Sequence, residues 1–182
     1  MIYKQIYRTP DDFDDLIMIG EGNYLKTLIF INSKSNYEYF NNCEEKNIPI
    51  FDKTRLWLDI YFSGNVPEFI PEYKLDDLTM FRKEVIDIMN KITYGKTITY
   101  NEIAEIIAEK RGVKKMSAQA VGGAVGWNPI CIIIPCHRVV GVNGNLTGYG
   151  GGMKNKIALL KLEKNDMSNF FISKEKTINE KM

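Results

Sequence analysis

Two apolar runs within residues 15–31 form the first clear pattern along the chain. They flank the turn-forming sequence Gly20-Glu21-Gly22-Asn23. Apolar runs of this length around a glycine-rich turn predict a β-hairpin. The spacing then changes, because residues 50–62 carry apolar side chains at helical intervals. Pro49 precedes them, and proline favours the first position of a helix, so this stretch predicts a helix.

Residues 64–71 separate this first part from a helical second part. One glycine and two prolines fall in this short stretch, which makes it the best candidate for a domain linker. Beyond it, Thr79 is the predicted N-cap of a helix. The apolar residues of that helix recur at the spacing of one helical face and are Phe81, Val85, Ile88 and Met89.

Two further short helices are predicted on either side of a glycine-containing turn. Asn101 is the expected cap of the first, and the second starts near Ser117 and runs to Val125. This arrangement predicts helix-turn-helix geometry. The second helix consists mostly of small residues, which permit its backbone to approach a neighbour closely. That neighbour is either the protein core or a DNA backbone, and composition leaves both open.

The last third combines a buried segment, a loop and a final helix. Residues 130–134 are four isoleucines and one cysteine, which predicts a buried strand or extended segment. A glycine-rich loop is expected at 148–152, and a last helix that starts at Met153 and includes Glu163. The sequence beyond Glu163 is largely polar, so residues 166–182 are expected to form a loosely held tail.

Composition narrows the class of protein further. The chain has 182 residues, of which 45% are hydrophobic, enough for a folded core, and its net charge of +1 argues neither for nor against nucleic acid. No apolar run approaches the roughly 20 residues needed to cross a bilayer, and the N-terminus lacks a signal-peptide core, so we expect a cytoplasmic protein. Three cysteines and a single histidine, His137, predict free thiols and no metal site.

The adjacent pair Cys136 and His137 is the strongest candidate for chemistry. A cysteine reacts as its thiolate, and a neighbouring imidazole lowers the thiol pKa. Adjacent side chains of a strand point to opposite faces, so the chain must leave strand geometry here, or a bridging group such as water must connect the two. A carboxylate from elsewhere would have to orient the imidazole. Taken alone, the pair also fits a buried thiol beside a surface histidine.

Four segments of the second half together resemble a known family. They are residues 94–100, 120–124, 128–140 and 146–152, and Pro-Cys-His-Arg-Val at 135–139 is the most specific part. In this order they resemble the O6-alkylguanine-DNA alkyltransferases, or methylated-DNA–protein-cysteine methyltransferases, over about residues 78–163. The resemblance implies an α/β protein of three parts. These are a small RNase H-like α/β domain (1–75), a mostly helical active-site and DNA-binding domain with the helix-turn-helix (76–165), and the tail (166–182).

The same resemblance implies DNA repair by direct, irreversible, single-turnover transfer of an alkyl group from O6-alkylguanine to Cys136, without a cofactor. O4-alkylthymine is left open as a second substrate. His137 would be the general base through a water, Glu163 would orient His137, and Asn128 would hold the turn before the active-site segment. Tyr149 would stabilise the departing guanine. The residues expected to line the guanine and alkyl pocket are Val139, Gly150, Gly151 and Cys131.

The implied partner is double-stranded DNA, bound by a monomer that flips the damaged nucleotide out of the helix. The residues expected to face DNA are Tyr100, Ser117, Ala118, Gln119 and Gly122. Well-known members of the family carry an arginine where Gln119 stands, as a finger that fills the gap left by the flipped base. Gln119 can still hydrogen-bond the orphaned partner base, but it carries no positive charge.

Three other readings of the sequence compete with this one. A non-catalytic protein that binds alkylated DNA is the main alternative, but such relatives lack the acceptor cysteine, and Cys136 is present. A helix-turn-helix regulator of this kind would need an additional cysteine-rich metal domain. A cysteine–histidine hydrolase normally has its two catalytic residues far apart in sequence, whereas Cys136 and His137 are adjacent.

Overall fold

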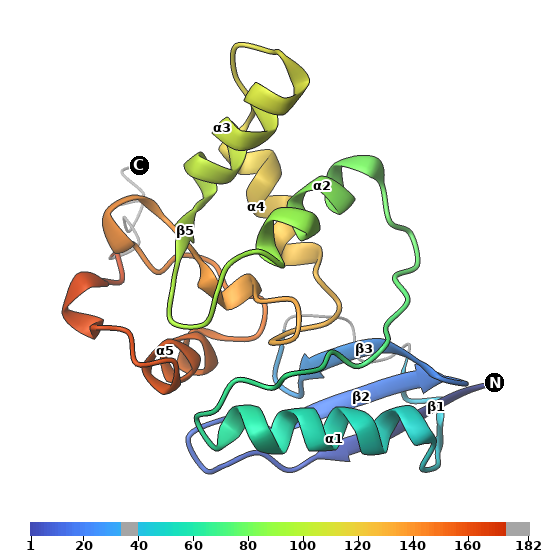
Figure 1. Ribbon diagram of the computed structural model, residues 1–182. Coiled ribbons are helices and arrows are strands. Elements are labelled where there is room, and N and C mark those ends of the chain that lie inside the picture. The colour runs from blue at the N-terminus through green and yellow to red at the C-terminus, as the bar shows by residue number, and fades with distance from the viewer. Residues whose placement is uncertain (34–39, 174–182) are drawn as a thin grey trace, which may run out of the picture.

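The computed structural model describes residues 1–33 and 40–173, and it forms a sheet layer below a group of helices (Figure 1). The helices and strands, in chain order, are β1 (Ile2–Tyr7), β2 (Leu16–Glu21), β3 (Tyr24–Phe30), β4 (Glu44–Glu45), α1 (Pro49–Phe62), α2 (Met80–Met89), β5 (Ile98–Thr99), α3 (Tyr100–Arg111), α4 (Ala118–Trp127), β6 (Val139–Val140) and α5 (Met153–Leu162). No helix in these described ranges is long and apolar enough to cross a membrane.

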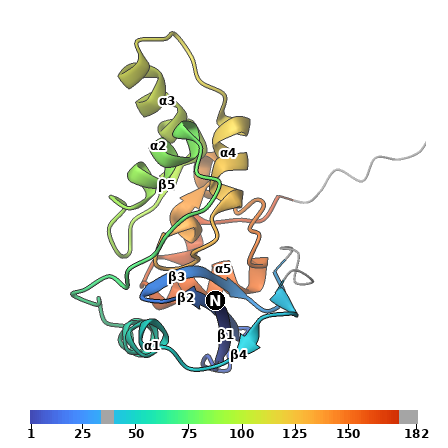
Figure 2. The same cartoon turned by 90° about the vertical axis from the view of Figure 1, so that its right-hand side faces the viewer.

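The N-terminal half is a small sheet with one helix against it. The hairpin expected in residues 15–31 is confirmed as β2 and β3, with Glu21 and Tyr24 paired beside the turn. Sequence reasoning missed β1, which pairs antiparallel with β2 and gives the strand order β3-β2-β1-β4. The expected helix is confirmed as α1, which begins at Pro49 and covers the face of the sheet away from the other helices (Figure 2).

Three helices of the second half, α2, α3 and α4, stand together away from the sheet (Figure 1). Thr79 caps α2, and Ser117 caps α4, as predicted. The predicted cap of α3 at Asn101 is wrong. Thr99 is the cap, because its hydroxyl accepts from the backbone N–H of Glu102 at 3.1 Å while the Glu102 carboxylate accepts from the N–H of Thr99 at 2.7 Å. This reciprocal capping box satisfies two backbone donors, which Asn101 does not.

The strand expected at residues 130–134 is not formed. Ile130 and Cys131 make only isolated bridges, to Leu28 and Ile134, and Ile132 has a φ of 71°. A left-handed conformation is rare for a β-branched residue and turns the chain back on itself. The apolar composition correctly indicated burial, since all five residues are buried. Burial alone did not indicate that the segment folds into a compact turn.

The end of the described chain is more ordered than the sequence suggested. Helix α5 ends at Leu162, so Glu163 is the residue that caps the helix and not part of it. Residues 166–173 do not form a loose tail, because Phe171 donates its N–H to the Gly144 carbonyl at 3.1 Å and its carbonyl accepts from Leu146 at 2.8 Å. Residues 174–182 of the expected tail lie outside the described residues.

A single hydrophobic cluster extends through both halves of the protein. Two backbone segments that follow α1 attach directly to β3, one ahead of α2 and one after α4. Leu28 donates to the Pro129 carbonyl at 2.8 Å and accepts from Cys131 at 2.7 Å, and Leu25 bonds with Glu72 and Lys74 at 2.8 and 2.9 Å. The edge of the sheet therefore supports the segment that leads into Cys136 and His137.

Candidate active site

The carboxylate of Glu163 is the centre of a buried hydrogen-bond network. It is only 2% exposed and follows directly after α5. Its Oε1 accepts from His137 Nε2 at 2.8 Å, from the Tyr61 hydroxyl at 2.7 Å and from Arg138 Nη2 at 2.8 Å. Its Oε2 accepts from Arg138 Nε at 2.9 Å and from the backbone N–H of Gly95 at 3.1 Å. The carboxylate expected from the sequence to orient the histidine is therefore in contact with it.

The ionisation of this network follows from its partners. Burial opposes ionisation of Glu163, but hydrogen bonds from His137 and Arg138 outweigh it and hold the pKa of the carboxyl well below its usual range. Burial lowers the pKa of His137 in spite of Glu163, which favours an uncharged ring at neutral pH. The carboxylate then fixes the ring proton on Nε2, and Nδ1 is left as the acceptor nitrogen. Among the described residues, no partner hydrogen-bonds to Nδ1, which is buried.

Sequence reasoning missed two members of the network, Tyr61 and Arg138. Tyr61 is a buried residue of α1, and its hydroxyl also lies 3.4 Å from His137 Nε2. In the sequence it is one more aromatic residue of an amphipathic helix, so nothing local could have marked it. In the sequence, Arg138 is one residue of the Pro-Cys-His-Arg-Val motif, and nothing local marks it as a partner of Glu163. Its Nη1 also donates to the Ile92 carbonyl at 2.6 Å, so it connects Glu163 to the chain beyond α2.

The thiol of Cys136 faces a pocket next to this network. Residues 136–138 form a single 3₁₀ turn, so the chain leaves strand geometry at this point, which is one of the two alternatives that the sequence left open. Cys136 is 4% exposed, and its Sγ lies 3.8 Å from the Tyr149 hydroxyl. The cavity has a volume of about 20 Å³, enough for about one water molecule. Its lining residues are Ile29, Ser33, Tyr100, Val125, Gly126, Asn128, Cys131, Cys136, Gly148, Tyr149, Gly150 and Gly151.

The surroundings of Cys136 favour its thiolate. A hydrogen bond with Cys131 has the largest effect, and together with those from Asn128 and Tyr149 it outweighs the cost of burial, so that the pKa of Cys136 falls to about 7. The charge of Lys156 contributes in the same direction. Lys156 is fully buried, its Nζ donates to the Val139 carbonyl at 2.7 Å, and burial lowers its pKa to about 8. Sequence reasoning missed Lys156, because lysine at a helix start is usually exposed.

The structure brings most of the predicted pocket residues together. Cys131, Gly150 and Gly151 line the cavity, and a side chain at Gly151 would come within 2.8 Å of both Tyr149 and Phe30, so glycine permits this close packing. The predicted role of Asn128 fits its contacts, because it accepts from Ile130 N–H at 3.0 Å and donates to the Ile134 carbonyl at 2.9 Å. Val139 does not line the cavity; it lies in β6.

Four of the five residues expected to face DNA line a groove beside the thiol pocket. Tyr100, Ala118, Gln119 and Gly122 line this groove, which has a volume of about 430 Å³. Tyr100 and Gly148 line both the groove and the pocket, so the two cavities adjoin. The small-residue helix therefore presents one side to an open surface next to Cys136.

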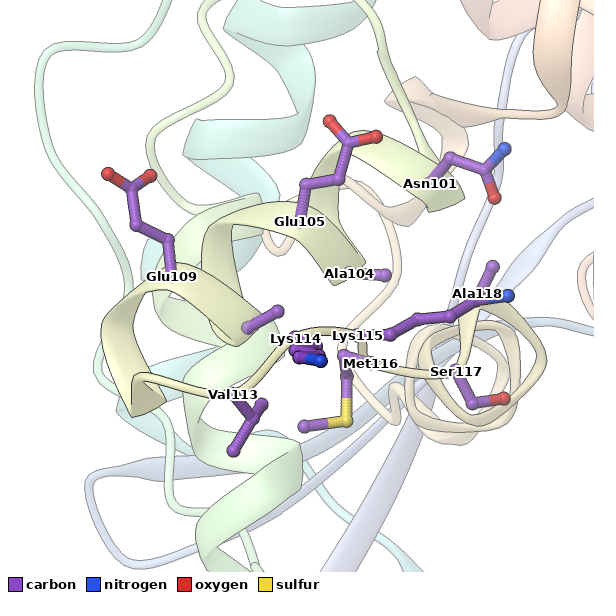
Figure 3. Close-up of a pocket in the computed structure, with 11 residues that line it drawn as sticks. Asn101, Ala104, Glu105, Glu109, Val113, Lys114, Lys115, Met116, Ser117 and Ala118 are labelled. Atoms are coloured by element: carbon purple, nitrogen blue, oxygen red, sulfur yellow. The ribbon is translucent and has the colours of Figure 1, made fainter.

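Ser117 lies elsewhere, at a larger groove of about 930 Å³ between α3 and the segment that leads into α4 (Figure 3). Ala118 borders both grooves. Glu105 and Glu109 line the larger groove from α3, together with Lys114 and Lys115 from the connecting segment. Among the residues that the structure describes, no group of three or more histidine, cysteine or acidic side chains could hold a metal ion there or elsewhere.

Comparison with known proteins identifies the family of this chain. The family model for the DNA-binding domain of 6-O-methylguanine DNA methyltransferase matches residues 80–165. A methylated-DNA–protein-cysteine methyltransferase from Haemophilus influenzae is 42% identical over 164 residues, which cover 90% of this chain and 87% of that protein. The crystal structure of a Mycobacterium tuberculosis O6-methylguanine methyltransferase is 36% identical, with a TM-score of 0.75 over 90% of this chain and 93% of the other. A Mycobacterium tuberculosis OGT in complex with DNA aligns with a TM-score of 0.73, 36% identity and coverage of 92% and 94%.

The contact between Tyr61 and Glu163 generates a prediction about stability. Replacing Tyr61 with phenylalanine keeps the ring in the core but removes one donor to a buried carboxylate. Because hydrogen bonds to charged groups contribute about 1.5–3 kcal/mol, Tyr61→Phe should lower the free energy of unfolding by that amount in urea denaturation. Tyr94→Phe is the matched control, since the Tyr94 hydroxyl donates to the neutral carbonyl of Leu162 at 3.0 Å. Equal losses in the two variants would contradict a special role for Tyr61.

Proposed function

Because this chain belongs to the methylated-DNA–protein-cysteine methyltransferase family, we propose that Cys136 is the residue that receives the alkyl group. The protein is a DNA-binding repair methyltransferase that transfers an alkyl group from DNA to a cysteine. The donor that we propose is O6-alkylguanine in double-stranded DNA. The observation that carries the proposal is the Cys136 thiol, with its lowered pKa, directly preceding a buried histidine whose ring is oriented by Glu163.

The proposed reaction is a displacement at the alkyl carbon. The thiolate sulfur of Cys136 forms a bond to that carbon while its bond to O6 breaks, and guanine departs with the electron pair. His137 accepts the thiol proton at Nδ1 through a bridging water, because Glu163 holds the other ring nitrogen protonated. The product is a thioether, which is chemically stable, so each molecule reacts once. No cofactor takes part, since the damaged DNA is itself the donor.

Guanine recognition requires the pocket to enlarge. A cavity of about 20 Å³ does not admit a purine, so the residues around it have to move when a base enters. The glycine-rich loop is the wall best suited to move, since the groove proposed for DNA lies on its other side. Tyr149, at 3.8 Å from Cys136 Sγ, is positioned to donate to the departing base. The backbone of Gly150 and Gly151 would then face the guanine edge, and Val139 would line the enlarged pocket from β6.

DNA is proposed to lie along the groove formed by Tyr100 and α4. Helices α3 and α4 would act as a helix-turn-helix, with the small residues of α4 in the minor groove and the damaged nucleotide turned into the pocket. Gln119 lines this groove and is proposed to hydrogen-bond the base left unpaired, and Ser117 would bind the DNA backbone at the start of α4. We propose that the protein acts as a monomer. The division into an RNase H-like domain (1–75) and an active-site domain (76–165) stays a prediction.

The decisive experiment is to measure the intact mass of the protein after incubation with a duplex that carries one O6-methylguanine. We expect a gain of one methyl group per chain, located on Cys136 by peptide mapping and absent from Cys136→Ser. Cys43→Ser is a matched control, since that cysteine lies outside the pocket and should not affect the gain. Selective binding to the damaged duplex without any mass gain would instead establish a non-catalytic binder of alkylated DNA. The proposal would be refuted if the protein showed no mass gain and no selective binding to the damaged duplex.

The role proposed for Gln119 can be separated from the chemistry at Cys136. Gln119→Ala removes the side chain that would bind the orphaned base, so transfer from a duplex should slow by about tenfold, the equivalent of about one hydrogen bond. Transfer from free O6-methylguanine base needs no flipping and should slow much less. Both rates are measured in single-turnover reactions by the loss of free Cys136 thiol. If Gln119→Ala slowed transfer equally from the duplex and from the free base, a role of Gln119 in base flipping would be excluded.

The pH dependence of transfer follows from the lowered pKa of Cys136. With a pKa of about 7, half of the thiol is ionised at pH 7, and the reactive fraction rises with pH. The single-turnover rate at saturating duplex should be about fivefold lower at pH 6 than at pH 7 and nearly constant above pH 8. Cys131→Ala removes the hydrogen bond with the largest effect and should move the midpoint to higher pH. If the wild-type rate still rises tenfold per pH unit near pH 8, the reactive thiol does not have a pKa of about 7.

A further inference from the structure

Two cysteines share the thiol pocket, although the reaction proposed above uses only one. Cys131 and Cys136 both line the small cavity, both are buried, and both are free thiols. The turn between them causes this proximity. The left-handed residue Ile132 and the bond from Ile134 N–H to the Ile130 carbonyl at 3.0 Å fold the segment back on itself.

The rest of the structure holds the two sulfurs in this arrangement. The backbone N–H of Cys131 donates to the Leu28 carbonyl of β3 at 2.7 Å, and Asn128 bonds the segment at the Ile134 carbonyl. Cys43 is excluded from the pair, because it directly precedes β4, which lies at the opposite edge of the sheet from β3.

The two thiols differ in ionisation. The pKa of Cys136 is lowered to about 7, whereas the hydrogen bond with Cys136, together with burial, raises the pKa of Cys131 well above its usual value. One sulfur is therefore available as a nucleophile while its neighbour keeps its proton. A reactive low-pKa thiol beside a second, resolving thiol is the arrangement found in cysteines that are oxidised reversibly.

We propose that Cys131 and Cys136 form a reversible disulfide when a hydroperoxide enters the pocket. The Cys136 thiolate attacks one peroxide oxygen and the O–O bond breaks, which gives a sulfenic acid and a hydroxide that takes up a proton. The Cys131 sulfur then attacks the Cys136 sulfur, the S–O bond breaks, and the oxygen leaves as water with the Cys131 proton. Two thiols lose two electrons in total, and one hydrogen peroxide becomes two waters.

The disulfide would protect a thiol that the protein can use only once. Further oxidation of a sulfenic acid to a sulfinic or sulfonic acid is irreversible, whereas a disulfide is reopened by a dithiol. Oxidation would also stop alkyl transfer until reduction, because the Cys136 sulfur is then no longer a nucleophile. The cavity holds about one water molecule, so hydrogen peroxide is the hydroperoxide whose size comes nearest to it. This chemistry goes beyond alkyl transfer and requires no DNA.

The test compares reduced wild-type protein with Cys131→Ser and Cys43→Ser after exposure to hydrogen peroxide. Free thiols are then blocked with N-ethylmaleimide, and the tryptic peptides are analysed without reduction. No lysine or arginine lies between Lys115 and Arg138, so both sulfurs fall on the peptide 116–138. In wild type and Cys43→Ser this peptide should be lighter by two hydrogens and unblocked, and dithiothreitol should restore two blockable thiols. In Cys131→Ser, fragment ions should place added oxygens on Cys136.

Alkyl-transfer activity provides a second readout, with each protein compared to its own untreated sample. Dithiothreitol should restore most of the activity of peroxide-treated wild type and only a minor part of that of Cys131→Ser. Cys131→Ala covers the case in which serine disturbs the pocket, and it should behave in the same way. The proposal would be overturned if Cys136 of wild type gained oxygens as fast as Cys136 of the variants and no internal disulfide formed. The peptide masses are independent of DNA, so this outcome is distinct from a failure of the alkyl-transfer proposal.

Discussion

The carboxylate of Glu163 has to remain ionised in the interior of the protein, and much of the site is arranged to allow it. A buried carboxylate without partners would take up a proton, because burial penalises its charged form. Tyr61, His137, Arg138 and the Gly95 N–H each donate to it, and Arg138 also supplies the compensating charge. These donors come from α1, from the turn after Pro135 and from the loop before β5. One charged group therefore fixes the relative positions of three distant parts of the chain.

The same interaction determines what the histidine can do. Since the carboxylate holds a proton on Nε2, the ring presents Nδ1 as its acceptor, and burial keeps the ring uncharged. The thiolate of Cys136 is favoured separately, by the hydrogen bonds of Cys131, Asn128 and Tyr149 and by the charge of Lys156. The site therefore has a base and a nucleophile that are tuned by different neighbours, and a change at one of them need not abolish the other.

The N-terminal half is part of this site as well as a structural support. Tyr61 reaches the carboxylate from α1, Ile29 and Ser33 line the thiol cavity, and Leu28 of β3 hydrogen-bonds the backbone on either side of Ile130. The family model for the DNA-binding domain matches residues 80–165 in the second half, whereas a relative and a solved structure align over 90% of the chain. The first half contributes contacts that sequence motifs do not reveal, because a tyrosine or isoleucine in a core position has no local signature.

Local sequence was sufficient for the hairpin, for the helix that begins at Pro49 and for the helices capped by Thr79 and Ser117. It was also sufficient for the identity of the reactive pair, because turns, caps and the Pro-Cys-His-Arg-Val motif depend on neighbouring residues. It was not sufficient for strand β1, whose pairing partner lies further along the chain. It failed at residues 130–134, where isoleucines indicated burial but the left-handed turn at Ile132 depends on contacts with β3 and Asn128. The contacts of Tyr61 with Glu163 and of Lys156 with Val139 likewise join residues that are distant in sequence. Packing of the two halves brings Tyr61 to the site, since hydrogen bonds and burial act through space, whereas sequence patterns report the local chain.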